Sequence, residues 1–472
     1  MDTIVVELPA EHKDLADLVV AASQRLRSVG ERAGRGRSLD IKQMEKEIAE
    51  LAGQMERAMV AHTLRSLDVD AERVVIEGRP YVRVGRHPMT YYCMAGEVVV
   101  ERSIFRPLGE RNGKTVDPIA LRAGLIEGRW MPATAQAMAH RLSVGTSREA
   151  EASSKLEHRL PYSRTSFETV GHAVGKALVQ HRAEVEQALI ERYEVPAGTK
   201  SIGVALDRGA MAFEEPRKRP PGRPRKDAPK RPIQRVFHMA WSGTVTMHDA
   251  NGNVLDTIHY GREPSAGAEL VQTLLDDVRA IREAHPELPI VLLADGAHEL
   301  WNLLEPHFAD LPDVTSTVDF WHLGGKLAAA AKLVWGQESV QVLAHWKRSL
   351  LRTTHAVAQI LDDLHASGME DARLGETKPV HEAITYLTNH QHRMRYAANR
   401  RRGLPIGSGP VEANAKSLYT IRMKRPGARW KPETADHVLQ LRAHALSNRF
   451  EAAVEMIEPR RRVVRPLPSA AA

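Results

Sequence analysis

The spacing of apolar residues changes along the chain and separates helical from strand-forming segments. Between residues 40 and 67, apolar side chains recur at alternating spacings of three and four: Ile41, Met44, Ile48, Leu51 and Met55. This period predicts one amphipathic helix, which either packs on its own domain or forms a short coiled-coil seam between subunits. The basic stretch before it, residues 27–38, is predicted to be a flexible linker.

The next segment has the composition of strands. Residues 80–106 contain two runs rich in β-branched and aromatic residues on either side of Ala95-Gly96, which predicts a β-hairpin. Four arginines lie on or beside these strands, either on a solvated sheet face or on a ribbon that contacts phosphates: Arg83, Arg86, Arg102 and Arg106.

Residues 133–190 return to helical patterns, broken by Ser, Thr, Gly and Pro turns. Several short helices of this kind are typical of a helix-turn-helix unit, although any small helical bundle has a similar pattern. The turn at Ser163 places Arg164 at a helix N-terminus, where contacts to phosphates form readily. We therefore expect Arg164 to contact DNA.

From residue 199 the pattern becomes that of an α/β domain. Three strands come first, the second and third joined at a tight Asn251-Gly252 turn, and strands and helices then alternate to about residue 320. This order predicts a mixed five-stranded sheet flanked by helices, the arrangement of a ribonuclease H-like core. Residues 321–403 carry only helical patterns and are predicted to be an all-α insertion.

The chain is therefore expected to combine a mainly helical N-terminal region, which contains the hairpin, with an interrupted α/β core. The predicted boundaries are 1–75 for a helical segment suited to dimerisation, 76–132 for the hairpin module, 133–198 for the helix-turn-helix-like DNA-binding segment, 199–320 for the first part of the core, 321–403 for the insertion, 404–457 for the second part of the core, and 458–472 for a disordered basic tail.

Composition narrows the class of protein. A chain of 472 residues exceeds one ordinary core, so about two to four domains are expected. Lys and Arg number 66 against 59 Asp and Glu, a net charge of +7. The single cysteine, Cys93, excludes an internal disulfide and a Cys-rich zinc module, so no zinc is expected. No secretory signal is visible and no apolar run approaches the ~18 residues of a membrane span. These features predict a cytoplasmic, nucleoid-associated protein that binds nucleic acid and no membrane.

Three acidic residues carry the candidate chemistry. Asp207 and Asp295 each end an apolar, strand-like run, and Glu412 follows a Gly-Ser-Gly-Pro helix start. A carboxylate at the end of a buried strand is costly unless it binds a cation. We assign all three to a site for two Mg²⁺ or Mn²⁺ ions, with Asp207 bridging both and Asp295 and Glu412 completing one side each. The alternative for either Asp is a helix cap, for instance Asp295 on the helix that begins near Ala297.

Basic stretches predict DNA contacts outside this site. Residues 216–235 are rich in Pro, Lys and Arg and resemble an AT-hook; a solubilising loop is the alternative. The expected contacts there are Arg217, Lys218, Arg219, Arg223, Arg225 and Lys226. A second candidate phosphate-binding surface, or else a solvated loop, contains Arg422, Lys424, Arg425, Arg429 and Trp430.

Two aromatic positions and two histidines are assigned to less specific roles. Trp301 and Trp321 are expected to pack in the core, with stacking on an unpaired base as the alternative. His390 and His392 are expected to lie on a solvated helix surface.

The motifs around these residues resemble those of a known family. The stretches VALDRGA, LLADGAHELW, DFWH, LPIGSGPVEANAKSL and RMKRPGARW, within Ser201 to Phe450, are similar to the DDE transposases of bacterial insertion sequences, in particular the ISKra-type family. The resemblance implies a catalytic triad of Asp207, Asp295 and Glu412. Asp319 and His322 resemble the Asp-x-x-His element of Mutator and hAT transposases and are expected at the mouth of the active site. The alternative is an Asp-capped helix with a half-buried histidine.

The resemblance also implies the activity. The chain is expected to bind terminal inverted repeats as a dimer or larger assembly, to cleave DNA with divalent metal ions, and to transfer the freed 3′-hydroxyl to target DNA. Two alternatives remain at this point. One is a ribonuclease H-like nuclease without strand transfer, and the other is an inactive, transposase-derived DNA-binding protein.

Overall fold

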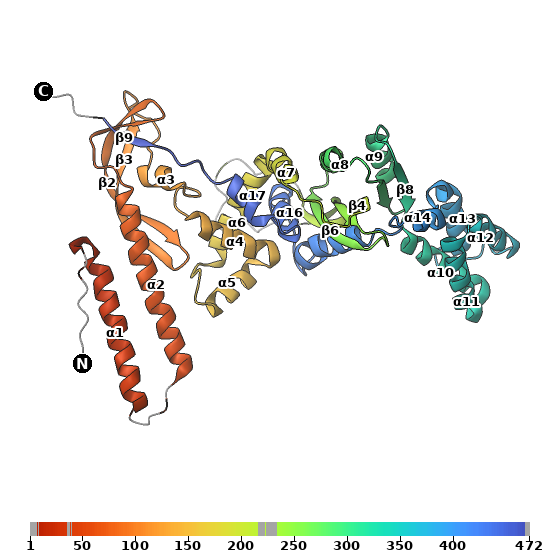
Figure 1. Ribbon diagram of the computed structural model, residues 1–472, viewed down its shortest axis with the longest axis horizontal. Helices are drawn as coiled ribbons and strands as arrows, with labels where there is room; N and C mark the ends of the chain where they lie inside the picture. Colours follow the sequence, from red (N-terminus) through yellow and green to blue (C-terminus); the bar gives the residue numbers. More distant parts are fainter. Residues whose placement is uncertain are drawn as a thin grey trace. The chain divides into compact units, whose positions relative to one another are not determined.

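The computed structural model describes residues 7, 9–34, 38, 40–215, 222 and 234–467. The chain divides into two compact units (Figure 1), the first comprising Met1–Ala177 with Val454–Ala472 and the second comprising Leu178–Ala453. The predicted DNA contacts of the basic stretch lie outside the described residues: Arg217, Lys218, Arg219, Arg223, Arg225 and Lys226. Within the described part of the chain, no helix is long and apolar enough to cross a membrane.

The first unit begins with two long helices that pack against each other, α1 (Lys13–Gly34) and α2 (Ile41–Ser66). Helix α2 lies where the apolar period predicts it, and the Asp40 side chain caps it by accepting a hydrogen bond from Gln43 N at 3.0 Å. The expected linker at 27–38 is wrong for its first part, because α1 continues to Gly34. Gly30 does not stop the helix, because a glycine inside a helix costs only about 1 kcal/mol relative to alanine.

The sheet of the first unit has the strand order β3-β2-β1-β9. Strands β2 (Arg79–Cys93) and β3 (Gly96–Pro107) form a hairpin where the sequence predicts one, with Cys93 opposite Gly96. Strand β1 (Arg73–Ile76) pairs on one side with β2 and on the other with β9 (Val464–Pro466). Figure 1 shows this C-terminal strand, in blue, beside strands from the beginning of the chain. The expectation of a disordered tail at 458–472 is therefore wrong for the residues of β9.

Local pattern could not reveal β9, because its partner is distant in sequence. Val464 is buried in a cluster with Val74, Ile76 and Phe105. The pairing is antiparallel and sets Val75 opposite Arg465. A three-residue strand next to several arginines has no signal of its own until β1 provides its hydrogen bonds.

Three of the four arginines considered for the hairpin have acidic partners. Arg83 pairs with Asp70, Arg86 lies 3.3 Å from Asp68, and Arg102 lies 2.8 Å from Asp117. The fourth, Arg106, donates to Arg111 O at 2.8 Å. These contacts favour the sheet face over the phosphate-contacting ribbon. The remaining helices here are α3 (Pro118–Ala123), α4 (Pro132–Val144), α5 (Ser147–Leu156) and α6 (Arg164–Gln180). Arg164 begins α6 as expected, 3.7 Å from Glu168.

The second unit is built on a mixed five-stranded sheet of order β6-β5-β4-β7-β8. Strands β4 (Ser201–Glu214), β5 (Arg235–His248) and β6 (Val254–Arg262) are antiparallel, whereas β7 (Ile290–Ala294) and β8 (Val314–Val318) run parallel to β4. Helices flank this sheet, as expected of a ribonuclease H-like core. Its apolar strands are buried on both faces, which explains their unbroken runs of Val, Ile, Leu and Ala.

The two faces of the sheet pack against different helices. Ile202, Val204 and Leu206 of β4 lie in the main core with α8 (Gly267–Ala284) and α9 (His298–Phe308). On the other face, Ala205 of β4 packs with Val411 of α15 (Gly409–Ala415). The further helices are α7 (Arg182–Glu191), α10 (Phe320–Trp335), α11 (Ser339–Arg352), α12 (Ala356–Ala366), α13 (Pro379–His390), α14 (Tyr396–Arg401), α16 (Pro432–Leu446) and α17 (Phe450–Met456).

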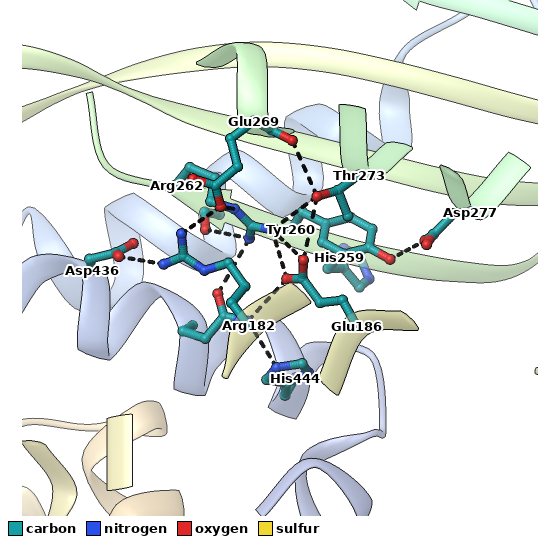
Figure 2. A network of polar contacts seen from close by, with 12 residues as sticks. Arg182, Glu186, His259, Tyr260, Arg262, Glu269, Thr273, Asp277, Asp436 and His444 are labelled. Carbon is teal, nitrogen blue, oxygen red and sulfur yellow. Dashed lines mark hydrogen bonds and ion pairs between the residues drawn. The ribbon is translucent and has the colours of Figure 1, made fainter. Parts of the chain in front are cut away.

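A buried network of charges joins α7, β6, α8 and α16 (Figure 2). Arg262 on β6 is fully buried and donates to both carboxylate oxygens of Glu186, at 2.7 and 2.6 Å. Arg182 pairs with Asp436 and donates to Glu269 at 2.8 Å. Breaking such a pair leaves an uncompensated buried charge, at a cost of about 3–5 kcal/mol. The network therefore fixes how α16 lies against β6.

A histidine in this network gives the unit a pH-dependent stability. Burial lowers the pKa of His444 from 6.5 to about 4, and Arg262, Arg449 and Arg182 act in the same direction. The folded state keeps the ring neutral, so the unfolded chain binds more protons between pH 6.5 and 4. The contribution is fully present above pH 6.5 and is lost as the pH falls towards 4.

We expect His444→Gln to flatten the fall in the free energy of unfolding between pH 6.5 and 4. One such group accounts for up to about 1.4 kcal/mol per pH unit. Urea unfolding at several pH values measures the slope, with His365→Gln, at an exposed position on α12, as the matched control. An unchanged slope in His444→Gln would contradict this role.

Candidate active site

Asp207 and Asp295 lie near each other where the pairing of β4 with β7 ends. Strands β4 and β7 pair in parallel up to Ala205 and Leu293, and each aspartate lies two residues further along the chain. Asp207 is still in β4 and shares the face of Ala205, whereas Asp295 directly follows the last residue of β7. Asp207 does not end its strand, contrary to the sequence interpretation, because β4 continues to Glu214 beside β5. The pairing of β4 with β7, in contrast, ends before Asp207.

Glu412 reaches the same face on helix α15. Val411 is buried against Ala205, Val291 and Leu293. Asn414 anchors the helix, since its amide donates to Ser242 Oγ at 2.9 Å, Gly243 O at 3.1 Å and Tyr260 O at 3.2 Å. Glu412 lies in the first turn and its side chain is exposed.

The electrostatics place the three acids in one neighbourhood. Burial raises the pKa of Asp207 above its ordinary value, and the carboxylates of Asp295 and Glu412 raise it further. His322 acts in the opposite direction on the same carboxyl group. The fold thus brings Asp295, Glu412 and His322, which are far from Asp207 in the sequence, within electrostatic range of it.

The hydrogen bonds of the two aspartates are local and incomplete. Asp207 Oδ1 accepts from Arg208 N at 2.7 Å, and Asp295 Oδ1 accepts from Ala297 N at 2.8 Å. The second bond belongs to the turn before α9, close to the capping alternative, although α9 itself has no side-chain cap. Within the described chain, the Oδ2 atoms of Asp207 and Asp295 have no hydrogen-bond or ion-pair partner. Each aspartate therefore keeps one oxygen for a ligand.

The three carboxylates are of the chemical type that binds a hard divalent cation. Carboxylate oxygens are the ligands that Mg²⁺ and Mn²⁺ prefer, and bound cations would relieve the repulsion that raises the pKa of Asp207. Among the described residues, no group of three or more His, Cys, Asp or Glu side chains is close enough to hold one ion. The three acids must therefore approach one another to share a cation.

Asp319 is buried below the candidate site, where it supports neighbouring elements, and it does not line the opening of the site. It is fully buried, and its Oδ1 accepts from His322 N at 2.5 Å, which caps α10. Its Oδ2 accepts from the backbone N–H and the hydroxyl of Ser408, at 2.5 and 2.9 Å. The capped-helix alternative is therefore right for Asp319, and Ser408 binds Asp319 instead of capping α15. Asp319 ties the start of the Glu412 helix to the end of β8.

Two glycine–tyrosine contacts next to the acids were missed by the sequence analysis. A Cβ atom on Gly209 would lie 2.5 Å from the ring of Tyr419, and one on Gly296 would lie 2.1 Å from the ring of Tyr386. Both tyrosines are buried, and their hydroxyls have no hydrogen-bond partner among the described residues. Tyr419 lies on the π-helix η4 (Lys416–Met423), an irregularity frequent at functional sites. The only sequence signal was a glycine one or two residues after each Asp.

The tryptophan and histidine assignments are partly wrong. Trp301 is in the core, where its indole N–H donates to Asp295 O at 2.6 Å. Trp321 is 65 % exposed, with the Lys347 ammonium 5.6 Å from its ring centre, so core packing does not apply to it. His390 is only 2 % exposed and not solvated, because α13 turns it towards Arg393.

The second basic stretch is only partly a surface. Arg422 is buried with its guanidinium 5.0 Å from the Trp430 ring centre, and the Trp430 indole donates to Met423 O at 3.0 Å. These two residues hold the segment against β4, which corrects their assignment as phosphate contacts. Lys424 is exposed, Arg425 donates to Ile421 O, and Arg429 lies 3.2 Å from Glu214. The predicted DNA contacts of these three residues remain predictions.

Comparison with known proteins adds little to this geometry. No family model matches the chain, and no curated protein matches it. Four solved chains match, among them the Mos1 transposase paired-end complex with left transposon end, at 15% sequence identity and a TM-score of 0.16. That match covers 58% of this chain and 79% of the other. A TM-score of this size supports no argument about fold or function.

We expect Asp319→Asn to loosen the start of α15 while β4 stays intact. The amide group would face the Ser408 N–H, so the charged hydrogen bonds to Ser408 are lost, at about 1.5–3 kcal/mol each. Hydrogen exchange followed by mass spectrometry should show faster exchange over residues 407–415. Ser408→Ala removes only the hydroxyl bond and should have a smaller effect. Unchanged exchange in Asp319→Asn would contradict the positioning role.

Proposed function

We propose that this chain is a transposase of the DDE type, which cuts the ends of a mobile DNA element and joins the freed 3′-hydroxyl to target DNA. One observation carries the proposal. Asp207 on β4 and Asp295, which directly follows the parallel strand β7, lie within electrostatic range of each other, and Glu412 approaches Asp207 on the helix that packs on Ala205 and Leu293. The resemblance of the surrounding motifs to bacterial insertion-sequence transposases supports the same conclusion.

The three carboxylates would hold a pair of Mg²⁺ or Mn²⁺ ions. Such ions would supply Lewis-acid stabilisation of the attacking and leaving oxygens in a displacement at phosphorus. The protein's own contribution is to orient the donors. Asn414 and Asp319 fix the helix of Glu412, and Trp301 and the turn to Ala297 fix Asp295. We assign to His322, which is exposed and lies within electrostatic range of Asp207, the role of donating to a phosphate oxygen.

The tyrosines near the acids argue against a covalent protein–DNA intermediate formed on them. Tyr419 and Tyr386 are buried, and burial raises the pKa of both hydroxyls. The negative charges of Asp207, beside Tyr419, and Asp295, beside Tyr386, raise these pKa values further. A phenol that is neutral and shielded from solvent is a poor nucleophile. Direct attack by water and then by the 3′-hydroxyl therefore fits this site better.

The proposal extends to partners. The first unit, with its short helices and hairpin, is the candidate for recognising terminal inverted repeats, and the exposed Lys424 is a candidate contact for the DNA bound at the core. We assign a homodimer or a larger assembly, because two element ends must be processed together. These assignments rest on the proposed activity.

The test is a strand-transfer assay with purified full-length protein, Mg²⁺, a labelled oligonucleotide carrying the element end, and plasmid as target. Wild-type protein should join the two DNAs. Asp207→Asn, Asp295→Asn and Glu412→Gln should each lower joining on the order of 10³-fold or more, because the three residues act as a unit. All three should retain DNA binding.

Glu433→Gln, at an exposed acid in the first turn of α16, is the matched control and should leave joining unchanged. Metal-dependent cleavage without joining would contradict the proposal and indicate a nuclease. DNA binding without any metal-dependent cleavage would contradict it and indicate a DNA-binding protein without catalytic activity.

A further inference from the structure

The basic C-terminal segment is fixed to the first unit through its backbone. Arg462 N donates to Leu121 O and Leu467 N donates to Arg73 O, both at 2.9 Å. Val464 is buried in the cluster of Val74, Ile76 and Phe105, opposite Ile76 of β1. Pro459 O lies so close to Gly124 that a Cβ atom there would be 2.7 Å away. The arginines between Pro459 and Leu467 therefore project from a held backbone, which lowers the entropy lost when they bind a ligand.

This segment and β1 enclose an open groove of about 470 Å³. Four arginines line it: Arg460, Arg461, Arg462 and Arg465. All four are exposed. The groove therefore presents several guanidinium groups to solvent along one short stretch of surface.

The positive charge in the groove is largely uncompensated. Glu77 is the one acidic residue in the lining, and Arg462 lies 3.3 Å from it. Arg460, Arg461 and Arg465 have no ion pair or hydrogen bond from their side chains to any described residue. The hairpin arginines differ, because Arg83 and Arg86 both have acidic partners.

The positive charge of the groove continues on the outer face of the sheet. Arg465 lies opposite Val75, and Arg73 lies two residues before Val75 on β1, so the two arginines share a face. Both are exposed. The groove and this edge of the sheet form one surface, defined by Arg460, Arg461, Arg465 and Arg73, which we call the C-terminal arginine surface.

We propose that the C-terminal arginine surface binds the phosphate backbone of duplex DNA. Guanidinium groups bind phosphate oxygens through paired N–H donors, and four of them on an open surface suit a repeating polyanion better than a single small anion. No aromatic residue lines the groove among the described residues, so the base stacking that favours single strands is absent. Contacts of this kind are independent of base sequence. The choice of DNA as the partner rests on the proposed function.

The test compares two triple variants of the full-length chain with equal loss of charge. One is Arg460→Gln, Arg461→Gln and Arg465→Gln, and the other is Arg79→Gln, Arg83→Gln and Arg86→Gln at ion-paired hairpin positions. Fluorescence anisotropy measures binding to a duplex of unrelated sequence at a series of KCl concentrations, without divalent metal so that no cleavage occurs.

The first triple variant should reduce the slope of log K against log[KCl] by about 2–3, because each lost phosphate contact removes about 0.9. The hairpin triple should change it by less than about 1. Replacing Arg460, Arg461 and Arg465 by Lys should keep the slope, which shows that the fold tolerates changes there. A single strand of equal length should bind the wild-type protein more weakly than the duplex.

Equal slopes in the two Gln triples would overturn this inference and leave the proposed function standing, since DNA would then bind elsewhere. Equal or tighter binding of the single strand would also overturn it. Failure of the wild-type protein to bind any DNA would overturn both this inference and the proposed function.

Discussion

The parallel pairing of β4 with β7 is the constraint on which the candidate site depends. It ends at Ala205 and Leu293, two residues before Asp207 and Asp295, and the pairing of β7 with β8 ends at Ala294 and Val318, one residue before Asp295 and Asp319. Three carboxyl groups thus occur where neighbouring parallel pairings end. Such a group of like charges is unfavourable unless each charge is compensated. Hydrogen bonds from Ser408 compensate Asp319.

Two buried tyrosine rings pack next to two of the acids. Gly209 and Gly296 let these rings approach the backbone next to Asp207 and Asp295, one from η4 and one from α13. Burial is the main cause of the raised pKa of Asp207. Glu412, in contrast, is exposed.

A basic residue of this protein indicates a DNA contact only once its partners within the fold are known. The net charge of +7 is small, and many arginines are neutralised inside the fold, among them the fully buried Arg262 in the network of Figure 2. Arg422 was expected on the surface and is buried on Trp430. In contrast, the arginines of the C-terminal segment have almost no acidic neighbours. The contacts that a basic side chain makes within the fold therefore determine whether it can bind a phosphate.

The sequence by itself determined the elements whose signals are local. The apolar period predicted α2, the unbroken apolar runs predicted β7 and the succession of core elements along the chain, and the Gly-Ser-Gly-Pro start predicted α15 with Glu412 near its beginning. Only the tertiary structure decided the contacts between distant segments: Asp319 with Ser408, Gly296 with Tyr386, and β9 with β1. The reason is physical. Periodicity reports which side of an element is buried, whereas the partner of a buried group is fixed only when the whole chain packs.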